Sequence, residues 1–410
     1  MDKDICKKWL KNKTINPITK DKLKKRSSTY NLLEKYCIKQ RRRKSSKPVL
    51  LNDILEPFNK TLKYNVLNRL EYYKILNNYI NIINTKYEYN CIRFYKYVNN
   101  NPLYRLGNRI ILEKRIGTES LYGVVYLSYY KAPKTKNSKS ITLGYFAVKV
   151  FENIKVNVKE IQILNILTEK ALKAVCPHFP ISYGTLKCKS FYDKSKYNTS
   201  SMSKSILQSK LKTDIPDNFK KYNILFQINE LASGDCEHFI KNNNNTELQL
   251  NAILQIFISI FFFHNTIQSH HGDTHAGNFL YHIIKPNGYF YYKIYGNEYY
   301  IKNMGYLWVI WDFGYTTAYT NNKYLNIKDF EKIYVGLEHY TKNEYIKNTF
   351  LPKLNTIIKD PKYSNYNYEL IEELQKKLFD LLYNEISSIT KEKPKRRELL
   401  NKTPYILEEI

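Results

Sequence analysis

Three short segments of the chain carry residues that could bind a metal ion and a phosphate group. Asp273 and Asn278 lie five residues apart, and Asp312 follows an apolar run. Lys149 interrupts a run of β-branched and apolar residues. Carboxylate and amide oxygens are the hard ligands that Mg²⁺ prefers, and Mg²⁺ usually takes only one or two of them from a protein. Each residue alone also has an ordinary structural explanation, because an aspartate often ends a turn and a strand lysine often faces solvent.

The spacing of apolar residues predicts the elements that would position these side chains. An apolar helix over 253–263 precedes the first segment. Strands over 145–150 and 307–311 would carry the lysine and lead into the last aspartate. A helix from about Asn157 would place Glu160 on the same face as several apolar residues.

A pair of glycines, Gly117 and Gly123, lies at a predicted strand–turn–strand. The first strand would end at Ile116 and the second would begin at Val124. Because glycine has no Cβ, backbone N–H groups there can approach phosphate oxygens closely. An ordinary hairpin would give the same pattern.

In chain order, these segments resemble the motifs of protein kinases. A buried strand over 223–232 stands between the predicted glutamate helix and the aspartate loop, and Asp-Phe-Gly follows at 312–314. The loop at 271–278 (His-Gly-Asp-x-His-x-x-Asn) and the tyrosine-rich stretch at 289–302 also resemble kinase-like proteins of large DNA viruses. The resemblance covers roughly residues 106–340 and implies an α+β, two-lobed protein-kinase-like fold.

The resemblance assigns roles to the residues that would face the phosphates of ATP. Lys149 would hold the α- and β-phosphates and pair with Glu160, with Glu169 as the alternative partner. Asp273 would orient the acceptor hydroxyl and accept its proton. His275 would contact the γ-phosphate.

The resemblance also assigns residues to the metal ion and to the adenine ring of ATP. Asn278 and Asp312 would bind Mg²⁺. Backbone groups of Glu230 and Ala232 would form hydrogen bonds with adenine, and Asn229 would take the gatekeeper position beside it.

The glycine hairpin and the catalytic loop depart from the kinase pattern. Gly117, Gly123 and Val125 would cover the nucleotide, but Glu119 replaces the middle glycine and the loop is one residue longer. Gly272 replaces the arginine of the catalytic loop.

The segment after the Asp-Phe-Gly triplet departs more. A long spacer with a predicted β-hairpin at 289–302 precedes Asp312, and no Ala-Pro-Glu follows Gly314. Asp329 is the first acidic candidate for the next helix. The segment that positions peptide substrates in ordinary protein kinases is therefore reduced or absent.

The resemblance implies an ATP- and Mg²⁺-dependent phosphotransferase, and a serine/threonine protein kinase acting on a protein substrate is the leading interpretation. Two alternatives stay open, because a fold does not fix a substrate. One is a small-molecule kinase similar to aminoglycoside and choline phosphotransferases, which use similar loops. The other is a pseudokinase scaffold, which the altered glycine hairpin favours and the retained lysine, asparagine and aspartates oppose.

The N-terminus resembles the two-cysteine adaptor domain of large DNA viruses. The matching features are Cys6, Trp9, the Asn-Pro-x-Thr turn at 16–19, Tyr30 and Cys37. About thirty residues make a very small core, so a disulfide or close packing of the two cysteines would stabilise it. The resemblance implies a docking module with an unidentified partner. A basic leader with two incidental cysteines is the alternative.

Charge is concentrated at the N-terminus. The chain has a net charge of +29, and residues 1–50 hold 17 Lys/Arg against 4 Asp/Glu. Such a segment attracts polyanions, although solubility alone would also explain it. None of the six cysteines forms a C-x-x-C pair, so a structural metal site is not expected.

We expect an intracellular protein, in the host cytoplasm or virion if it is viral, with a basic run at 41–44 as a candidate nuclear signal. No secretory signal or membrane span is expected, because the longest apolar run, 256–263, is far shorter than the roughly 20 residues that a span needs. The predicted domains are an adaptor-like module (1–39), a basic linker (40–50), a helical extension (51–105), an N-terminal kinase lobe (106–232, with an insertion at 189–220) and a C-terminal lobe (233–410).

Overall fold

The computed structural model describes residue 12 and the ranges 69–84, 92–98, 101–107, 109–120, 123–131, 142–188, 224–319, 327–364 and 368–407. The chain divides into two units, Met1–Lys60 and Thr61–Ile410, and every described residue except Asn12 belongs to the second. The predicted adaptor module, the basic linker and the insertion at 189–220 lie outside the described residues.

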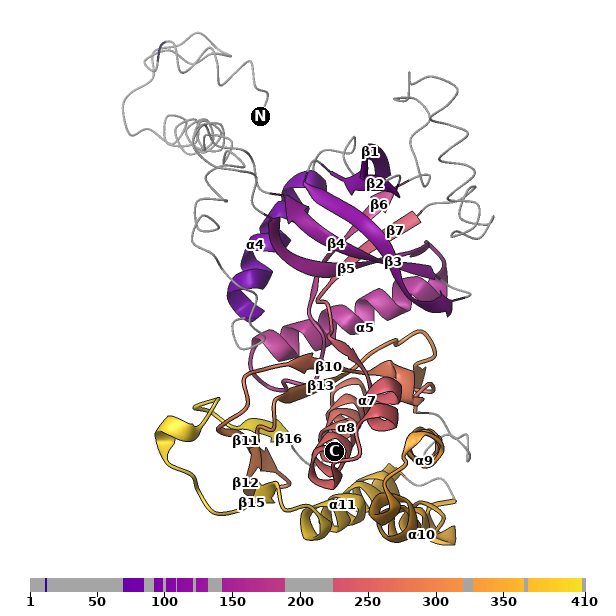
Figure 1. Ribbon diagram of the computed structural model, residues 1–410, viewed down its shortest axis with the longest axis vertical. Coiled ribbons are helices and arrows are strands. Elements are labelled where there is room, and N and C mark those ends of the chain that lie inside the picture. The colour runs from indigo at the N-terminus through magenta and orange to yellow at the C-terminus, as the bar shows by residue number, and fades with distance from the viewer. Residues whose placement is uncertain are drawn as a thin grey trace. The chain divides into compact units, whose positions relative to one another are not determined.

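Seven antiparallel strands form a curled sheet in the first part of Thr61–Ile410 (Figure 1). In spatial order they are β1 (Ile92–Val98), β2 (Asn101–Leu106), β3 (Ile110–Ser120), β4 (Gly123–Lys131), β5 (Thr142–Glu152), β7 (Ile224–Asn229) and β6 (Ser182–Cys188). The predicted lysine strand is therefore an inner strand, β5, with a neighbour on each side.

One face of this sheet is covered by helix α4 (Arg69–Asn84). Side chains along β4 alternate between fully buried and half-buried, as expected when successive residues point to opposite faces. On the buried face Tyr79 packs edge-on against Tyr130, with 4.9 Å between ring centroids. On the edge strand β6, Tyr72 makes a similar contact with Tyr183 at 5.5 Å. Tyrosines therefore attach α4 to the sheet.

Helix α5 (Lys155–Leu172) lies against the opposite face. Its Glu160 reaches Lys149 of β5, which is the direct cross-strand neighbour of the half-buried Val125 of β4. The helix predicted from about Asn157 is thus confirmed, and it begins two residues earlier.

The prediction of a helical extension over 51–105 is wrong in part. Helix α4 ends at Asn84, and strands β1 and β2 occupy much of the remaining length. The sequence of β1, IRFYKYV, is made of aromatic and β-branched residues around two basic ones, a composition that favours a strand.

The second part of Thr61–Ile410 is mainly helical, so the fold class is α+β. Its helices are α7 (Cys236–Asn242), α8 (Thr246–Ile267), α9 (Lys328–Tyr340), α10 (Leu351–Ile358) and α11 (Tyr368–Glu385), with short 3₁₀ helices η6 (Ala276–Asn278), η8 (Pro361–Ser364) and η9 (Arg396–Glu398) and a π-helical turn η7 (Ile346–Phe350). Phe257 and Phe261 of α8 pack on Phe330 of α9, with ring centroids 6.1 and 5.9 Å apart.

Helix α8 is the central element of this part. Asn245 caps its N-terminus by accepting a hydrogen bond from the N–H of Leu248, and nearly every residue from 249 to 264 is buried. Among the described residues it is the one helix with the length and apolar composition of a membrane span, and 83% of its most apolar window is buried inside the protein. A buried core helix meets the same criterion.

Short strands complete the second part. They form one sheet of β8 (Gly234–Asp235), β10 (Phe279–Ile283) and β13 (Tyr306–Ile310), a ribbon of β9 (Ser269–His270) and β14 (Thr317–Ala318), and a sheet of β11 (Tyr289–Ile294), β12 (Asn297–Lys302), β15 (Ile389–Thr390) and β16 (Tyr405–Leu407). The predicted hairpin at 289–302 is confirmed as β11–β12. Tyr295 and Gly296 form its turn with φ of 47° and 81°, the positive values that a two-residue hairpin loop of type I′ requires.

Candidate functional site

A buried ion pair joins the sheet to helix α5. Lys149 Nζ lies 2.6 Å from Glu160 Oε1, and the two residues are only 6% and 3% exposed. The predicted pairing is therefore confirmed for Glu160. The alternative partner, Glu169, is exposed on the same helix and pairs with Lys173.

A second carboxylate approaches the same lysine. Asp312 Oδ1 lies 3.5 Å from Lys149 Nζ, and the Asp312 side chain keeps about a third of its surface exposed. Burial opposes the charge on Lys149, but Glu160 and Asp312 outweigh this effect and hold its pKa above the ordinary value. Burial likewise opposes the charge on Asp312, yet Lys149 lowers the pKa of Asp312 below its usual range. Both groups are therefore charged at neutral pH.

The backbone at Asp312 has the unusual φ of 62°, in the left-handed region that non-glycine residues rarely adopt. The next side chain, Phe313, is buried, with its ring 5.5 Å from that of Phe263 and 5.4 Å from that of His271. The buried phenylalanine anchors the turn and leaves the Asp312 carboxylate on the side of Lys149. Uncommon backbone conformations of this kind occur often at functional sites.

The pairing of β10 with β13 brings the loop asparagine next to the strand that ends at Asp312. Phe279 pairs with Ile310, and the N–H of Trp311 donates a 2.8 Å hydrogen bond to the carbonyl of Asn278. The Asn278 side chain donates through Nδ2 to the Asp273 carbonyl at 2.8 Å and to Asp273 Oδ2 at 3.3 Å. These contacts use the amide nitrogen of Asn278, so its amide oxygen is the atom that could bind a metal ion.

A buried aspartate on α9 holds the loop that carries Asp273. Asp329 accepts hydrogen bonds from the backbone N–H groups of His271 and Gly272, both at 2.8 Å, and from His264 Nε2 at 2.9 Å. The hydroxyl of Thr274 donates to the Asp329 carbonyl at 2.6 Å. The sequence identified Asp329 only as an acidic residue of the next helix, so this positioning role was missed.

Ligand atoms of His264, His270 and Asp329 lie within 4.8 Å of one another, the spacing of a possible metal site. The 2.9 Å contact between His264 and Asp329 is already a hydrogen bond, and Asp329 also accepts two backbone N–H groups. We therefore interpret this buried cluster as the support of the loop.

Gly272, which replaces the arginine of the kinase pattern, has a structural explanation. Its φ is 79°, and a Cβ on this residue would lie 2.6 Å from the carbonyl oxygen of Tyr315. Any side chain would force the loop away from the segment that follows Asp312, so glycine keeps the two in contact.

Two further basic side chains lie beside Asp273. Lys332 Nζ of α9 is 3.2 Å from Asp273 Oδ1 and 2.6 Å from the carbonyl of Gly272. His275, predicted to contact phosphate, lies with Nε2 3.7 Å from Asp273 Oδ2 and is largely exposed. Lys332 was missed because nothing in the sequence relates it to a residue 59 positions earlier, apart from its place one helical turn after Asp329.

The predicted adenine-binding segment follows β7 and is held by α4. Arg69 donates to both carboxylate oxygens of Glu230 at 3.0 and 2.8 Å and to the Pro177 carbonyl at 2.8 Å. Burial lowers the pKa of Arg69 to about 10, so it stays charged at neutral pH. Among the described residues, no hydrogen bond is found for the carbonyl of Glu230 or the N–H of Ala232.

The strand β7 also places two polar side chains beside the lysine. Gln227 is the direct cross-strand neighbour of Lys149, and Asn229 is that of Ala147. Both amides are fully buried, and within the described part of the chain their nitrogen and oxygen atoms have no hydrogen-bond partner. The predicted gatekeeper Asn229 therefore lies on the same face as Lys149 with unsatisfied polar atoms.

The glycine hairpin is confirmed as β3 and β4. Val125 pairs with Lys149 across β4 and β5, so it lies on the same face of the sheet as the lysine. A Cβ on Gly123 would lie 2.8 Å from the Val150 carbonyl, so close strand packing requires this glycine whether or not phosphate binds. Gly117 lies in an irregular stretch of β3, where the pairing with β4 shifts after Ile116.

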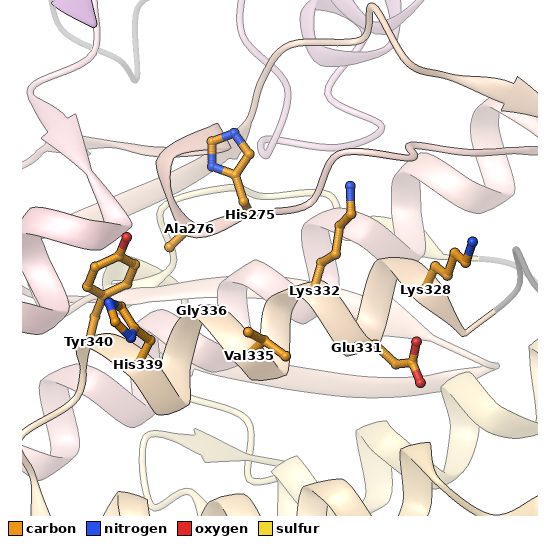
Figure 2. Close-up of a pocket in the computed structure, with 9 residues that line it drawn as sticks. All are labelled: His275, Ala276, Lys328, Glu331, Lys332, Val335, Gly336, His339 and Tyr340. Carbon is orange, nitrogen blue, oxygen red and sulfur yellow. The ribbon is translucent and has the colours of Figure 1, made fainter.

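A groove of about 580 Å³ opens between the loop and the exposed side of α9 (Figure 2). Loop residues His275 and Ala276 form one wall, and the other is formed by Lys328, Glu331, Lys332, Val335, Gly336, His339 and Tyr340. Lys332 both lines the groove and forms an ion pair with Asp273, so one end of the groove lies beside Asp273.

The comparison with protein families concerns the N-terminus. Residues 5–38 match the 2-cysteine adaptor domain. The match includes Cys6 and Cys37, so the predicted adaptor module is confirmed as a family match. No curated protein matches the chain.

The site therefore combines groups that could contact phosphate, bind a metal ion and accept a proton. Lys149 and Asp312 present opposite charges suited to a phosphate chain and its metal ion, and Asn278 adds a hard oxygen ligand. Asp273 is a partly exposed carboxylate that could accept a proton from a ligand in the groove.

Proposed function

We propose that the region from about residue 106 onward is a two-lobed, protein-kinase-like phosphotransferase that uses ATP and Mg²⁺. The curled sheet with α5 would form one lobe, and the helical part around α8 the other. The contact of Lys149 with both Glu160 and Asp312 carries this proposal, because it joins strand β5 and the helix that follows it to a loop 163 residues further along the chain.

The residues fit the two ligands that the proposal requires. Asn278 and Asp312 supply the hard oxygen atoms that would hold Mg²⁺, and Lys149 would neutralise phosphate charge. The unpaired carbonyl of Glu230 and N–H of Ala232, found so among the described residues, would receive adenine. When bound, ATP supplies the phosphoryl group and Mg²⁺ reduces the charge on its phosphates.

The chain's own groups would then perform the transfer. Asp273 would orient the acceptor hydroxyl and accept its proton, and Lys332 beside it would hold the carboxylate in place. Asp329 would keep the loop rigid through its two backbone hydrogen bonds. Positioning and charge account for most of the catalysis in phosphoryl transfer, so a rigid loop is what such an enzyme needs.

The test is nucleotide binding and transfer by the purified chain, with and without Mg²⁺, using labelled ATP and mixed protein substrates. Asp312→Asn should abolish the Mg²⁺-dependent part of both. Asp380→Asn, the same change at an exposed position of α11, is the matched control and should change neither. If nucleotide affinity did not change with Mg²⁺ or with Asp312→Asn, the pseudokinase-scaffold interpretation would replace the proposed enzymatic function.

We also propose that the adaptor domain at residues 5–38 docks the enzyme to a partner. A module of about thirty residues offers little more than a binding surface. Deleting residues 1–48 should leave nucleotide binding and the melting temperature of the remaining chain unchanged while removing the partner from pull-downs. Aggregation of the shortened chain would instead show that the module is integral to the fold.

A further inference from the structure

Helix α9 presents a continuous row of side chains to the groove beside Asp273. Lys328, Lys332, Val335 and His339 recur at intervals of three or four residues, so they share one face of the helix, and Glu331 lies one turn after Lys328 at its edge. Val335 in the middle of this row is 58% exposed. Figure 2 shows this row along the helix, with His275 of the loop above it.

The floor of the groove brings α9 close to the loop. A Cβ on Gly336 would lie 3.3 Å from Ala276 Cβ and 3.4 Å from Ala276 N, so glycine lets the helix approach η6 closely. At the same end, Lys332 Nζ lies 3.2 Å from Asp273 Oδ1. A ligand in the groove would therefore reach the carboxylate that the proposed function uses as a base.

The groove carries net positive charge. Lys328 and Lys332 contribute two ammonium groups, and the one acidic residue of its lining, Glu331, forms a 2.6 Å ion pair with Lys359. Lys328 has no ion-pair partner in the described part of the chain. Because Lys332 already pairs with Asp273 and Glu331 with Lys359, Lys328 gives the groove an excess positive charge, which favours an anionic ligand over a cationic one.

We propose that this groove binds the phosphate acceptor as an extended acidic peptide, with its serine or threonine hydroxyl beside Asp273. This inference rests on the proposed function and adds the substrate class. The row from Lys328 to His339 is about 16 Å long at 1.5 Å per helical residue, which matches about five residues of extended peptide. Aminoglycosides and choline are cations, so the same charge argues against the small-molecule alternative.

The proposed phosphoryl transfer balances in bonds, electrons and protons. The hydroxyl oxygen forms a bond to the γ-phosphorus of ATP while the bond from that phosphorus to the bridging oxygen breaks, and ADP leaves with the electron pair. The hydroxyl proton passes to Asp273. Acidic side chains on either side of the acceptor residue would lie against Lys328 and Lys332.

Two peptides and two charge reversals test the inference on the full chain. One fluorescein-labelled peptide has a single serine between glutamates, and the other has lysines in place of the glutamates. Lys328→Glu reverses a charge in the groove without touching Asp273. Lys347→Glu makes the same change in net charge at an exposed position of η7 and is the matched control. Fluorescence anisotropy gives the binding constant, and transfer from labelled ATP gives kcat/KM.

The acidic peptide should bind and be phosphorylated at least about tenfold better than the basic one. Lys328→Glu should weaken its binding by about tenfold, and Lys347→Glu by less than about twofold. Equal losses in the two variants would mean that the peptide is attracted diffusely to a basic protein. That result would contradict the proposal that it binds in the groove. Preference for the basic peptide would overturn the inference while leaving the kinase intact. Groove-dependent binding with no transfer to any substrate would instead refute the proposed function.

Discussion

The ammonium group of Lys149 lies 2.6 Å from Glu160 Oε1 and 3.5 Å from Asp312 Oδ1. Three elements meet at this point, since β5 carries the lysine, α5 the glutamate and the loop after β13 the aspartate. Because the Lys149–Glu160 pair is almost fully buried, its loss should affect both the fold and any bound phosphate.

Glu160→Gln should lower the free energy of unfolding by about 3 kcal/mol, because it leaves Lys149 buried with only one carboxylate. Nucleotide affinity should fall as well, since the ammonium would no longer be held toward the phosphates. Glu169→Gln is the matched control on the same helix, and its loss of an exposed pair should leave the free energy of unfolding nearly unchanged. Urea unfolding and nucleotide titration measure the two effects. Equal effects in the two variants would contradict the assignment of Glu160.

Asp329→Asn should destabilise the protein in a pH-dependent way. Burial would raise the pKa of Asp329, but His264 and the backbone N–H of Gly272 outweigh it and hold the pKa at about 2. A carboxyl group whose pKa is lower in the folded state stabilises the fold above its unfolded pKa, and this stabilisation is lost as the pH falls toward 2. The difference in unfolding free energy between wild type and Asp329→Asn should therefore shrink by about 2 kcal/mol between pH 4 and pH 2.

Urea unfolding at several pH values measures this difference. Asp380→Asn removes a carboxylate from an exposed position of α11, and its effect should stay small throughout. A difference for Asp329→Asn that did not change with pH would show that the carboxylate is not what holds the loop.

Much of the site was predictable because its residues stand in short segments with strong local signals. Lys149 interrupts an apolar strand, and Asp312 ends one, so their positions follow from the burial of β5 and β13. The choice of Glu160 over Glu169 also follows from helix geometry. Glu160 shares the buried face of α5 with Ile163 and Leu167, whereas Glu169 does not.

The supporting contacts were not predictable because they join distant segments. Arg69 pairs with Glu230 across 161 residues, and Lys332 reaches Asp273 across 59. No local pattern marks an arginine or a lysine for such a contact. The strand β1 was mistaken for helix because the helical spacing of the apolar residues between 66 and 83 was extended past its end, and the pairing of β1 with β2 decides the outcome.

His178 should make the stability of the protein depend on pH between about 4 and 6.5. Its Nδ1 lies 2.7 Å from the Trp308 carbonyl, which can only accept, so Nδ1 carries the proton and Nε2 accepts from the Tyr292 hydroxyl at 2.8 Å. Burial lowers the pKa of His178 to about 4. The unfolded chain therefore binds a proton that the folded chain does not, and stability falls as the pH drops from 6.5 to 4.

The expected loss is about 3 kcal/mol over this range. His178→Gln should be less stable at pH 7 but should lose less stability on acidification. His238→Gln, at an exposed position of α7, should keep the wild-type slope. Chemical unfolding between pH 4 and pH 7 gives the three slopes, and an unchanged slope in His178→Gln would contradict the assigned tautomer and charge state.

The most direct measurement compares turnover and nucleotide binding in Asp273→Asn. Asparagine keeps the volume and can still bond to Asn278 and the loop, but it cannot accept the hydroxyl proton. We predict that kcat for transfer from ATP falls by about 10²–10⁴-fold while the Kd for ATP stays within about threefold. Transfer at a near wild-type rate by this variant would contradict the account, because the activity would then come from a site other than the one beside Asp273.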